Sequence, residues 1–204
     1  NTSMVVLTTA RIIDIGNKLT YYSLHIIPFS HSSPFYSGRI WEGFSLRTFT
    51  RTGKRPAATL FLQNPAQLIK LAPSLTNIAR MLSEVGRIEF KAFDSCSDFS
   101  IYAGLLALLK GLVLDESLSE RAIVPDAEKH QISAQEGFDN EEIFEQAKQI
   151  IQLAEVALTN DSDVNLLAPL KTLLDKRETP THEIIRMYKH NNSIEATLKQ
   201  TYRA

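Results

Sequence analysis

The chain has 204 residues, of which 44% are hydrophobic and 22% are charged, a composition typical of a globular protein with a buried core. Its 22 basic and 23 acidic side chains leave a net charge of −1, which gives no electrostatic case for binding nucleic acid or an anionic membrane surface. Cys96 is the only cysteine, which excludes a disulfide framework within the chain and a cysteine-based metal cluster. We therefore expect a cytoplasmic protein, because a reducing compartment fits this cysteine usage.

The longest apolar stretch, residues 103–113, is too short to span a membrane and is interrupted by two glycines and Lys110. We therefore expect neither a membrane nor a nucleic acid among the partners. The sequence does not open on an initiator methionine, and apolar residues begin at Met4. From this start we expect the chain to be a piece of a longer protein.

The first 38 residues predict a strand, a helix and a loop. Residues 4–14 mix β-branched residues with Leu and Met, which favours a strand. Asn17 is a candidate N-cap for a helix over 17–27, which must end before Pro28. Residues 29–38 are rich in Ser, Pro and aromatic side chains and indicate a structured loop.

A second strand is predicted over residues 43–50, where apolar and polar side chains alternate. Phe44 and Leu46 fall on one face of this strand, and Ser45 and Arg47 fall on the other. The alternation thus places a basic group on the polar side of the predicted sheet.

The next forty residues predict a turn, a strand and two short helices. The turn covers 51–56 and the strand covers 57–63. Asn64 is a candidate N-cap before a proline, which favours a helix over 65–72. A second helix is predicted over 75–85, between a Pro-Ser pair and a glycine.

The central strand is predicted over residues 87–94, because its side chains alternate strictly. Ile88 and Phe90 fall on the face toward the core, whereas Glu89 and Lys91 fall on the polar face, roughly 6.5–7 Å apart along the strand. Asp94, at an odd offset from Glu89, falls on the opposite face, so the two acids do not form the acid pair of a glycosidase.

The remainder of the chain predicts helices. Ser97 is expected to cap an amphipathic helix, and Asn140 precedes two acids at a second helix start. Further helices are predicted over residues 126–136, 140–159, 163–175, 180–189 and 193–203. We therefore expect a single α+β domain over 1–204, with part of a mainly antiparallel sheet of three or four strands in 1–95 and a helical part in 96–204.

Three side chains stand out as a candidate phosphate-binding site: Arg47, Glu89 and Lys91. One carboxylate can hold Mg²⁺ through a hard oxygen, and two bases can neutralise phosphoryl oxygens. Other sites have weaker support. His25 and His31 lie six residues apart across a proline and do not form a metal pair. The common Gly-rich nucleotide motifs are absent from the sequence, and the histidines of the helical part are expected at the surface.

Three segments together resemble motifs of the glutamate–cysteine ligase family. They are Ser-Ser-Pro-Phe-Tyr-Ser-Gly at 32–38, Gly-Phe-Ser-Leu-Arg at 43–47 and Ile-Glu-Phe-Lys-Ala-Phe-Asp at 88–94. The resemblance is to the cyanobacterial-type branch, and it extends to the tail at 178–183 and 191–196.

This resemblance implies a glutamine-synthetase-like fold in which an antiparallel sheet holds ATP and Mg²⁺. The family joins glutamate to cysteine through a γ-glutamyl phosphate, the first step of glutathione synthesis. It implies that Glu89 binds Mg²⁺ and that Arg47 and Lys91 are catalytic residues that contact ATP or the transferring phosphate.

The sequence departs from the family in two ways. Lys91 stands where the family strand has Arg, and a lysine offers a point charge rather than a bidentate fork. The family's E-x-E strand and H-x-H segment, which belong to an N-terminal half, are not found in the chain. We therefore expect a C-terminal half whose partner is the missing N-terminal half. Two alternatives stay open: a related ligase with another amine substrate, and a catalytically silent helical interaction domain.

Overall fold

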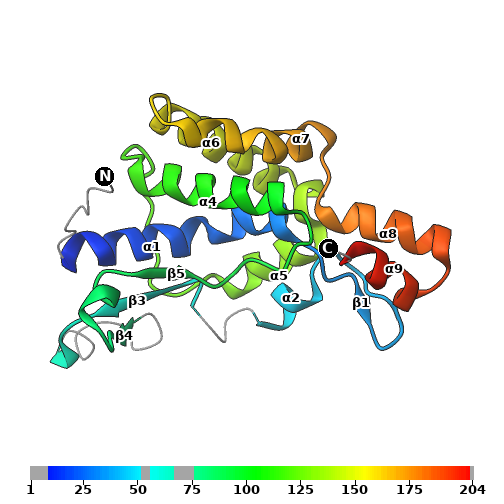
Figure 1. The fold of residues 1–204 in the computed structure, drawn as a ribbon, viewed down its shortest axis with the longest axis horizontal. Helices are drawn as coiled ribbons and strands as arrows, with labels where there is room; N and C mark the ends of the chain where they lie inside the picture. Colours follow the sequence, from blue (N-terminus) through cyan, green and yellow to red (C-terminus); the bar gives the residue numbers. More distant parts are fainter. Residues whose placement is uncertain (1–8, 52–55, 67–75, 203–204) are drawn as a thin grey trace.

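The computed structural model describes residues 9–51, 56–66 and 76–202, and it has an α+β fold (Figure 1). The described α-helices are α1 (Thr9–Ile26), α2 (Leu46–Arg51), α4 (Phe99–Leu114), α5 (Ala127–Glu136), α6 (Glu141–Ala157), α7 (Ala168–Lys176), α8 (Pro180–Asn191) and α9 (Ile194–Thr201). The described strands are β1 (Phe35–Tyr36), β2 (Arg39–Ile40), β3 (Ala58–Leu62), β4 (Thr76–Ile78) and β5 (Ile88–Phe90). Short 3₁₀ helices are η1 (Ile27–Ser30), η2 (Leu82–Glu84), η3 (Gly137–Asp139) and η4 (Ser162–Leu167).

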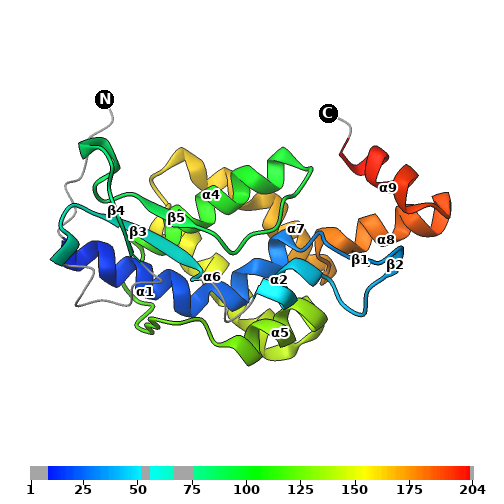
Figure 2. The same ribbon diagram turned by 90° about the horizontal axis from the view of Figure 1, so that it is seen from below.

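Helix α1 runs through the middle of the molecule and contacts β3, α4, α5 and α6 (Figures 1 and 2). The strand predicted over 4–14 is wrong for its described part, because residues 9–14 belong to this helix; residues 4–8 lie outside the described ranges. Buried Ile12, Ile15 and Leu19 follow the spacing of one helical face, and that packing outweighs the β-branched composition.

The three-stranded sheet has the order β4-β3-β5. Strand β3 pairs in parallel with β4 and antiparallel with β5, so the described sheet is mixed rather than mainly antiparallel. The strand predicted at 57–63 is confirmed as β3, all of whose residues are buried. Gly16 of α1 lies against Leu60 of β3, where a Cβ added at Gly16 would come within 2.7 Å of Leu60 Cδ2. The glycine thus allows the helix to approach the sheet closely.

Two local predictions around this sheet need correction. The helix predicted over 75–85 is wrong, since β4 and η2 occupy this region. The helix predicted over 65–72 and the turn predicted over 51–56 lie largely outside the described residues. The central strand predicted over 87–94 is confirmed for its first part, which is β5.

The strand predicted over 43–50 is also wrong, because residues 46–51 form helix α2. Ser45 explains the difference. Its hydroxyl accepts a hydrogen bond from the backbone N–H of Thr48 at 3.0 Å, and its carbonyl accepts one from Phe49 at 3.0 Å. A serine that satisfies these N–H groups starts a helix, although the side chains alternate in polarity.

The helical half agrees closely with the sequence pattern. Asp126, Asn140 and Ser193 cap α5, α6 and α9 through side-chain acceptors, and the helix start at Asn140 agrees with the one that the sequence predicts. The cap of α4 is Asp98 rather than Ser97. The helix predicted over 163–175 is divided into η4 and α7.

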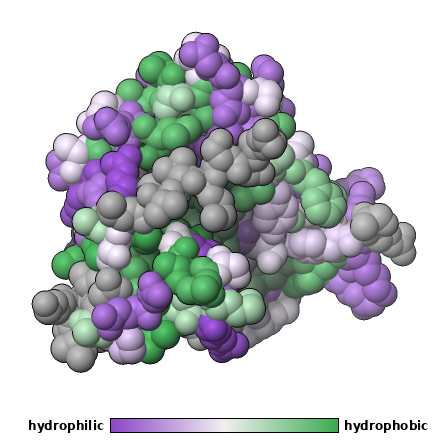
Figure 3. Space-filling view, turned by 60° about the vertical axis from the view of Figure 1, so that its left-hand side comes forward, coloured by the Kyte–Doolittle hydropathy of each residue, from purple (hydrophilic) through white to green (hydrophobic). Residues whose placement is uncertain are grey.

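One hydrophobic cluster joins α1 with α4, α6 and α7 and so connects the part before residue 95 with the helical part. Helices α4 and α6 meet at Gly111, where an added Cβ would lie 2.5 Å from Ala154 Cβ. No helix in the described part of the chain is long and apolar enough to cross a membrane. In the space-filling view of Figure 3, groups of hydrophobic residues lie among hydrophilic ones on the visible face.

The sheet lies at one end of the molecule, and the pair α8 and α9 extends from the other end beside the β1–β2 hairpin (Figures 1 and 2). The segment that follows β5 runs between these two ends, below α4, toward the start of α4. The predicted site residues lie in β5, at the start of this segment and on α2.

Candidate functional site

Arg47 lies on α2, Glu89 lies in β5, and Lys91 directly follows β5. The Arg47 guanidinium donates hydrogen bonds to two backbone carbonyls, those of Ala92 at 3.2 Å and Lys91 at 3.3 Å. Arg47 therefore lies next to the segment that carries Lys91, and it binds the backbone of Lys91 rather than its side chain. It does so from a helix, whereas the sequence predicted Arg47 on the polar face of a strand.

The strongest feature of this region is the buried carboxylate of Asp94, whose side chain is 0% exposed. Its Oδ2 accepts hydrogen bonds from Ser45 Oγ at 2.7 Å, Ser33 Oγ at 3.0 Å and the backbone N–H of Ser32 at 3.1 Å. Its Oδ1 accepts one from Arg47 at 3.2 Å. We call these five residues the Asp94 network. It ties together three segments that are separated by up to 62 residues in the sequence.

Sequence reasoning did not give Asp94 a role, because alternation along a strand says only which face it occupies. One signal was present: the serines, the arginine and the aspartate belong to the three motif segments that carry the family resemblance. The structure shows that these motif residues contact one another directly. A buried carboxylate needs several donors, and this one receives four.

Glu89 and Lys91 are more accessible. The side chain of Glu89 is 29% exposed and that of Lys91 is 43% exposed, and the two form an ion pair. Arg87 forms a second ion pair with Glu89 at 2.9 Å, and its guanidinium lies over the ring of Phe61. The hydrogen bond from Lys91 holds the pKa of the Glu89 carboxyl below its usual range. Glu89 is thus an ionised acid between two cations.

The described residues contain no group of three His, Cys, Asp or Glu side chains that could hold a metal ion. Mg²⁺ is commonly bound through one or two carboxylates together with phosphate oxygens and waters. Glu89 could supply one such oxygen, after Lys91 and Arg87 move away from it. The described residues do not form a complete Mg²⁺ site by themselves.

Two histidines are buried without complete hydrogen bonding. Both ring nitrogens of His31 and Nδ1 of His25 have no hydrogen-bond partner. Burial lowers the pKa of each imidazole to about 4, so both are neutral at pH 7. His130, expected at the surface, is instead buried, and its Nε2 lies 2.8 Å from Ser23 Oγ.

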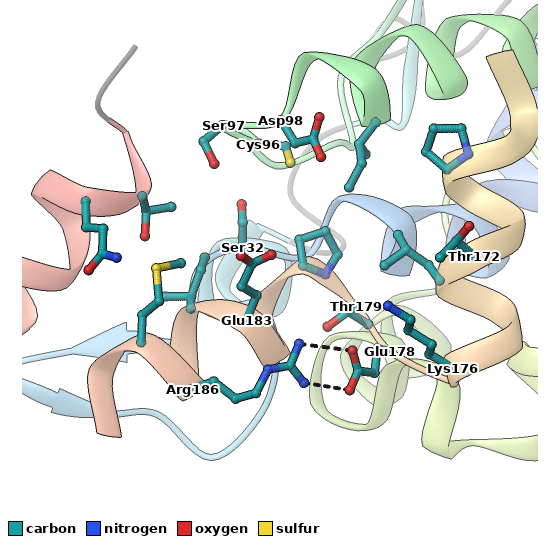
Figure 4. Close-up of a pocket in the computed structure, with 18 residues that line it drawn as sticks. Ser32, Cys96, Ser97, Asp98, Thr172, Lys176, Glu178, Thr179, Glu183 and Arg186 are labelled. Carbon is teal, nitrogen blue, oxygen red and sulfur yellow. Dashed lines mark hydrogen bonds and ion pairs between the residues drawn. The ribbon is translucent and has the colours of Figure 1, made fainter. Parts of the chain in front are cut away.

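A cavity of about 660 Å³ lies where the start of α4, the helices α7 and α8 and the end of α9 come together (Figure 4). Ser32 of the Asp94 network and the buried Cys96 line one side of it, with Ser97 and Asp98. Apolar and charged residues of α7, α8 and the turn between them line most of the rest. No sequence pattern indicated this cavity, because its walls come from four distant segments.

Two contacts set the shape of the wall next to Cys96. The hydroxyl of Ser32 donates to the backbone carbonyl of Ser95 at 2.7 Å, and Tyr202 Oη donates to the same carbonyl at 3.2 Å. The end of α9 is thereby attached to the segment that follows Asp94. The cavity and the Asp94 network are neighbours that share Ser32.

Comparison of the chain with protein-family models, with curated proteins and with solved structures gave no match. The assignment of a function therefore depends on the residues described above and on their geometry.

Proposed function

We propose that the chain supplies part of the active site of an ATP-dependent glutamate–cysteine ligase. The observation that carries this proposal is the Asp94 network. The three segments that resemble the family motifs, at 32–38, 43–47 and 88–94, meet at one buried carboxylate. Motifs that fold into one unit are expected to serve one site. The glutamine-synthetase-like fold and the role as a C-terminal half are parts of the same proposal.

The arrangement of β5 is compatible with a larger sheet. Among the described strands, β5 pairs only with β3 and forms one edge of the sheet, where a further strand would add. Additional strands from an N-terminal half could extend the sheet there and bring the further acids that a Mg²⁺ site needs. Glu89 lies in this edge strand, and Lys91 follows it.

The chemistry assigns a role to each exposed group. A carboxylate is a poor electrophile, so the ligase first forms γ-glutamyl phosphate, and the amine then displaces phosphate. Glu89 would offer a carboxylate oxygen to Mg²⁺, which binds the phosphates of ATP. Lys91 and Arg47 would neutralise negative charge on the phosphoryl oxygens. Arg47 also fixes the backbone of Lys91, which limits where the lysine can reach.

Calorimetric titration with Mg·ATP tests this proposal, with the missing half of the ligase supplied in trans. We expect heat of binding that disappears in Glu89→Gln, because the amide keeps the size of the side chain but loses the charge. Glu84→Gln is the matched control, since Glu84 also pairs with Arg87 and lies near β5. Heat that is unchanged in Glu89→Gln would contradict the assignment of Glu89.

A catalytically silent helical interaction domain is the second candidate. The observation that favours it is the neutralisation of Glu89 by Lys91 and Arg87, in a described part of the chain that contains no group of three His, Cys, Asp or Glu side chains able to hold a metal ion. Absence of any Mg·ATP heat from the reconstituted protein would support this candidate. A related ligase with another amine would instead retain the heat and fail to consume cysteine.

A further inference from the structure

The cavity beside Cys96 has two ends of opposite charge. Asp98 and Glu183 lie at the end next to Cys96, and both carboxylates raise the pKa of its thiol, which burial has already raised. Lys176 lies at the other end, next to Glu178 and the guanidinium of Arg186. Figure 4 shows Glu183 directed toward Ser32 and Lys176 directed into the cavity from a different helix.

The charged residues that line the cavity differ in whether they form ion pairs. Glu178 and Arg186 form a two-pronged ion pair, with distances of 2.6 and 3.1 Å. By contrast, Glu183 and Lys176 form no ion pair within 4 Å in the described ranges; Lys176 lies near Glu178, and Glu183 lies near Arg186. One acid and one base therefore line the same cavity, and the nearby opposite charges, Glu178 and Arg186, are already paired with each other.

Between the two ends the wall is apolar. The side chains that form it come from α4, α7 and α8 and are Ile101, Leu173, Ile184 and Met187. A cavity of about 660 Å³ is in the range of ligand sites and has room for more than one amino acid. An apolar middle with unpaired charges at its ends matches a ligand with the same three parts.

We propose that this cavity binds a zwitterion of the amino-acid class. A short peptide with free termini fits the cavity best. The ammonium group lies at the end formed by Glu183 and Asp98, and the carboxylate lies at Lys176. The apolar wall contacts a side chain between them. This inference does not depend on the ligase reaction, because it requires neither ATP nor Glu89.

Calorimetric titration of the chain without ATP tests the ligand class, with alanyl-leucyl-alanine as the probe. Three further probes are its N-acetylated form, its C-terminal amide and free leucine. We expect saturable binding of the peptide and about tenfold weaker binding of each blocked form, because each loses one charge-assisted hydrogen bond. Tighter binding of leucine than of the peptide would keep the zwitterion but overturn the peptide assignment. Equal binding of all four probes, or none, would overturn the proposal.

Variants locate the site. Lys176→Met and Glu183→Gln should each weaken peptide binding about tenfold, and both side chains are exposed, so folding should be unaffected. Lys171→Met, on the same helix as Lys176, and Glu195→Gln are matched controls that lie outside the cavity and should leave binding unchanged. Peptide binding that survives both cavity variants would refute this location.

Glu89→Gln separates this inference from the proposed function. The substitution should remove Mg·ATP binding from the reconstituted ligase and leave peptide binding by the chain unchanged. Loss of peptide binding in Glu89→Gln would show that the peptide binds near Glu89 and not in the cavity beside Cys96.

Discussion

Glu89 and Asp94 lie five residues apart in one motif segment, yet the structure uses them in opposite ways. The Asp94 side chain is fully buried and receives four hydrogen bonds from serines, a backbone N–H and Arg47. The Glu89 side chain is 29% exposed and has only cationic side chains as partners. Three of the four donors to Asp94 are serine hydroxyls or a backbone N–H, whereas both partners of Glu89 are long, rotatable side chains.

This difference separates a structural acid from an acid that is accessible to a ligand. A carboxylate bound by hydroxyls and backbone groups cannot exchange its partners without local unfolding, so Asp94 holds segments together. A carboxylate paired with exposed Lys91 and Arg87 loses little when these side chains move, because exposed ion pairs contribute only about 0–1 kcal/mol. Of these two acids, Glu89 is therefore the one suited to bind an incoming ion.

The largest expected effect is that of Asp94→Ala on stability. Its removal leaves buried donors of Ser32 and Ser45 without an acceptor, and we expect a loss of about 3 kcal/mol in the free energy of unfolding. Urea unfolding followed by circular dichroism measures it. Asp98→Ala is the control, since it removes a helix cap and should cost only about 1 kcal/mol. A smaller loss for Asp94 than for Asp98 would contradict the comparison.

Arg47 connects the two acids, because it contacts Asp94 and the backbone of Lys91. If the proposed ligase activity holds, we expect Arg47→Ala in the reconstituted protein to lower turnover by about 10²–10³, the effect of removing one charge-stabilising donor. Turnover should be measured beside the unfolding free energy, so that loss of folded enzyme is not mistaken for loss of catalysis. Near-normal turnover would mean that the contacts of Arg47 are structural only.

Stability should fall in mild acid because of His25 and His31, the latter close to the Asp94 carboxylate. Each has a folded pKa of about 4 and an unfolded pKa of about 6.5, so between these values the unfolded chain binds more protons. Stability is then constant above pH 6.5 and decreases as the pH falls toward 4. At pH 5 the expected loss is about 2 kcal/mol per histidine.

Urea unfolding at pH 7 and pH 5 measures this dependence. The double variant His25→Gln, His31→Gln should reduce the dependence without abolishing it, because burial also lowers the pKa of His130. The control His190→Gln, at an exposed position, should leave the dependence unchanged. An unfolding free energy that is equal at the two pH values in the wild-type chain would show that folding does not lower the pKa of these imidazoles.

The smallest expected effect is that of Glu89→Gln on stability. The ion pairs of Glu89 are exposed, so the free energy of unfolding should change by less than about 0.5 kcal/mol. The same urea measurement as for Asp94→Ala gives the direct contrast. A loss of about 2 kcal/mol or more would show that Glu89 is a structural acid as well, and it would weaken its proposed role toward Mg²⁺.

Much of the helical half could be predicted from the sequence, because its signals are local. Asp126, Asn140 and Ser193 each precede an apolar pattern of helical period, and a cap acts within three residues of itself. The α+β class and strand β3 follow from similar local patterns. The candidate site was predictable only in part: the sequence selected Arg47, Glu89 and Lys91, but not the partners of Arg47.

The sequence by itself determined where these helices begin, which segments can be buried, and which motif residues carry charge. Tertiary structure decided that residues 9–14 and 46–51 are helical, that Asp94 rather than Glu89 is buried, and that Lys176 and Glu183 face one cavity. The physical reason is the range of the interactions. Periodicity and capping act over a few residues, whereas Asp94 reaches Ser32 across 62 residues, and such a contact exists only after the chain has folded.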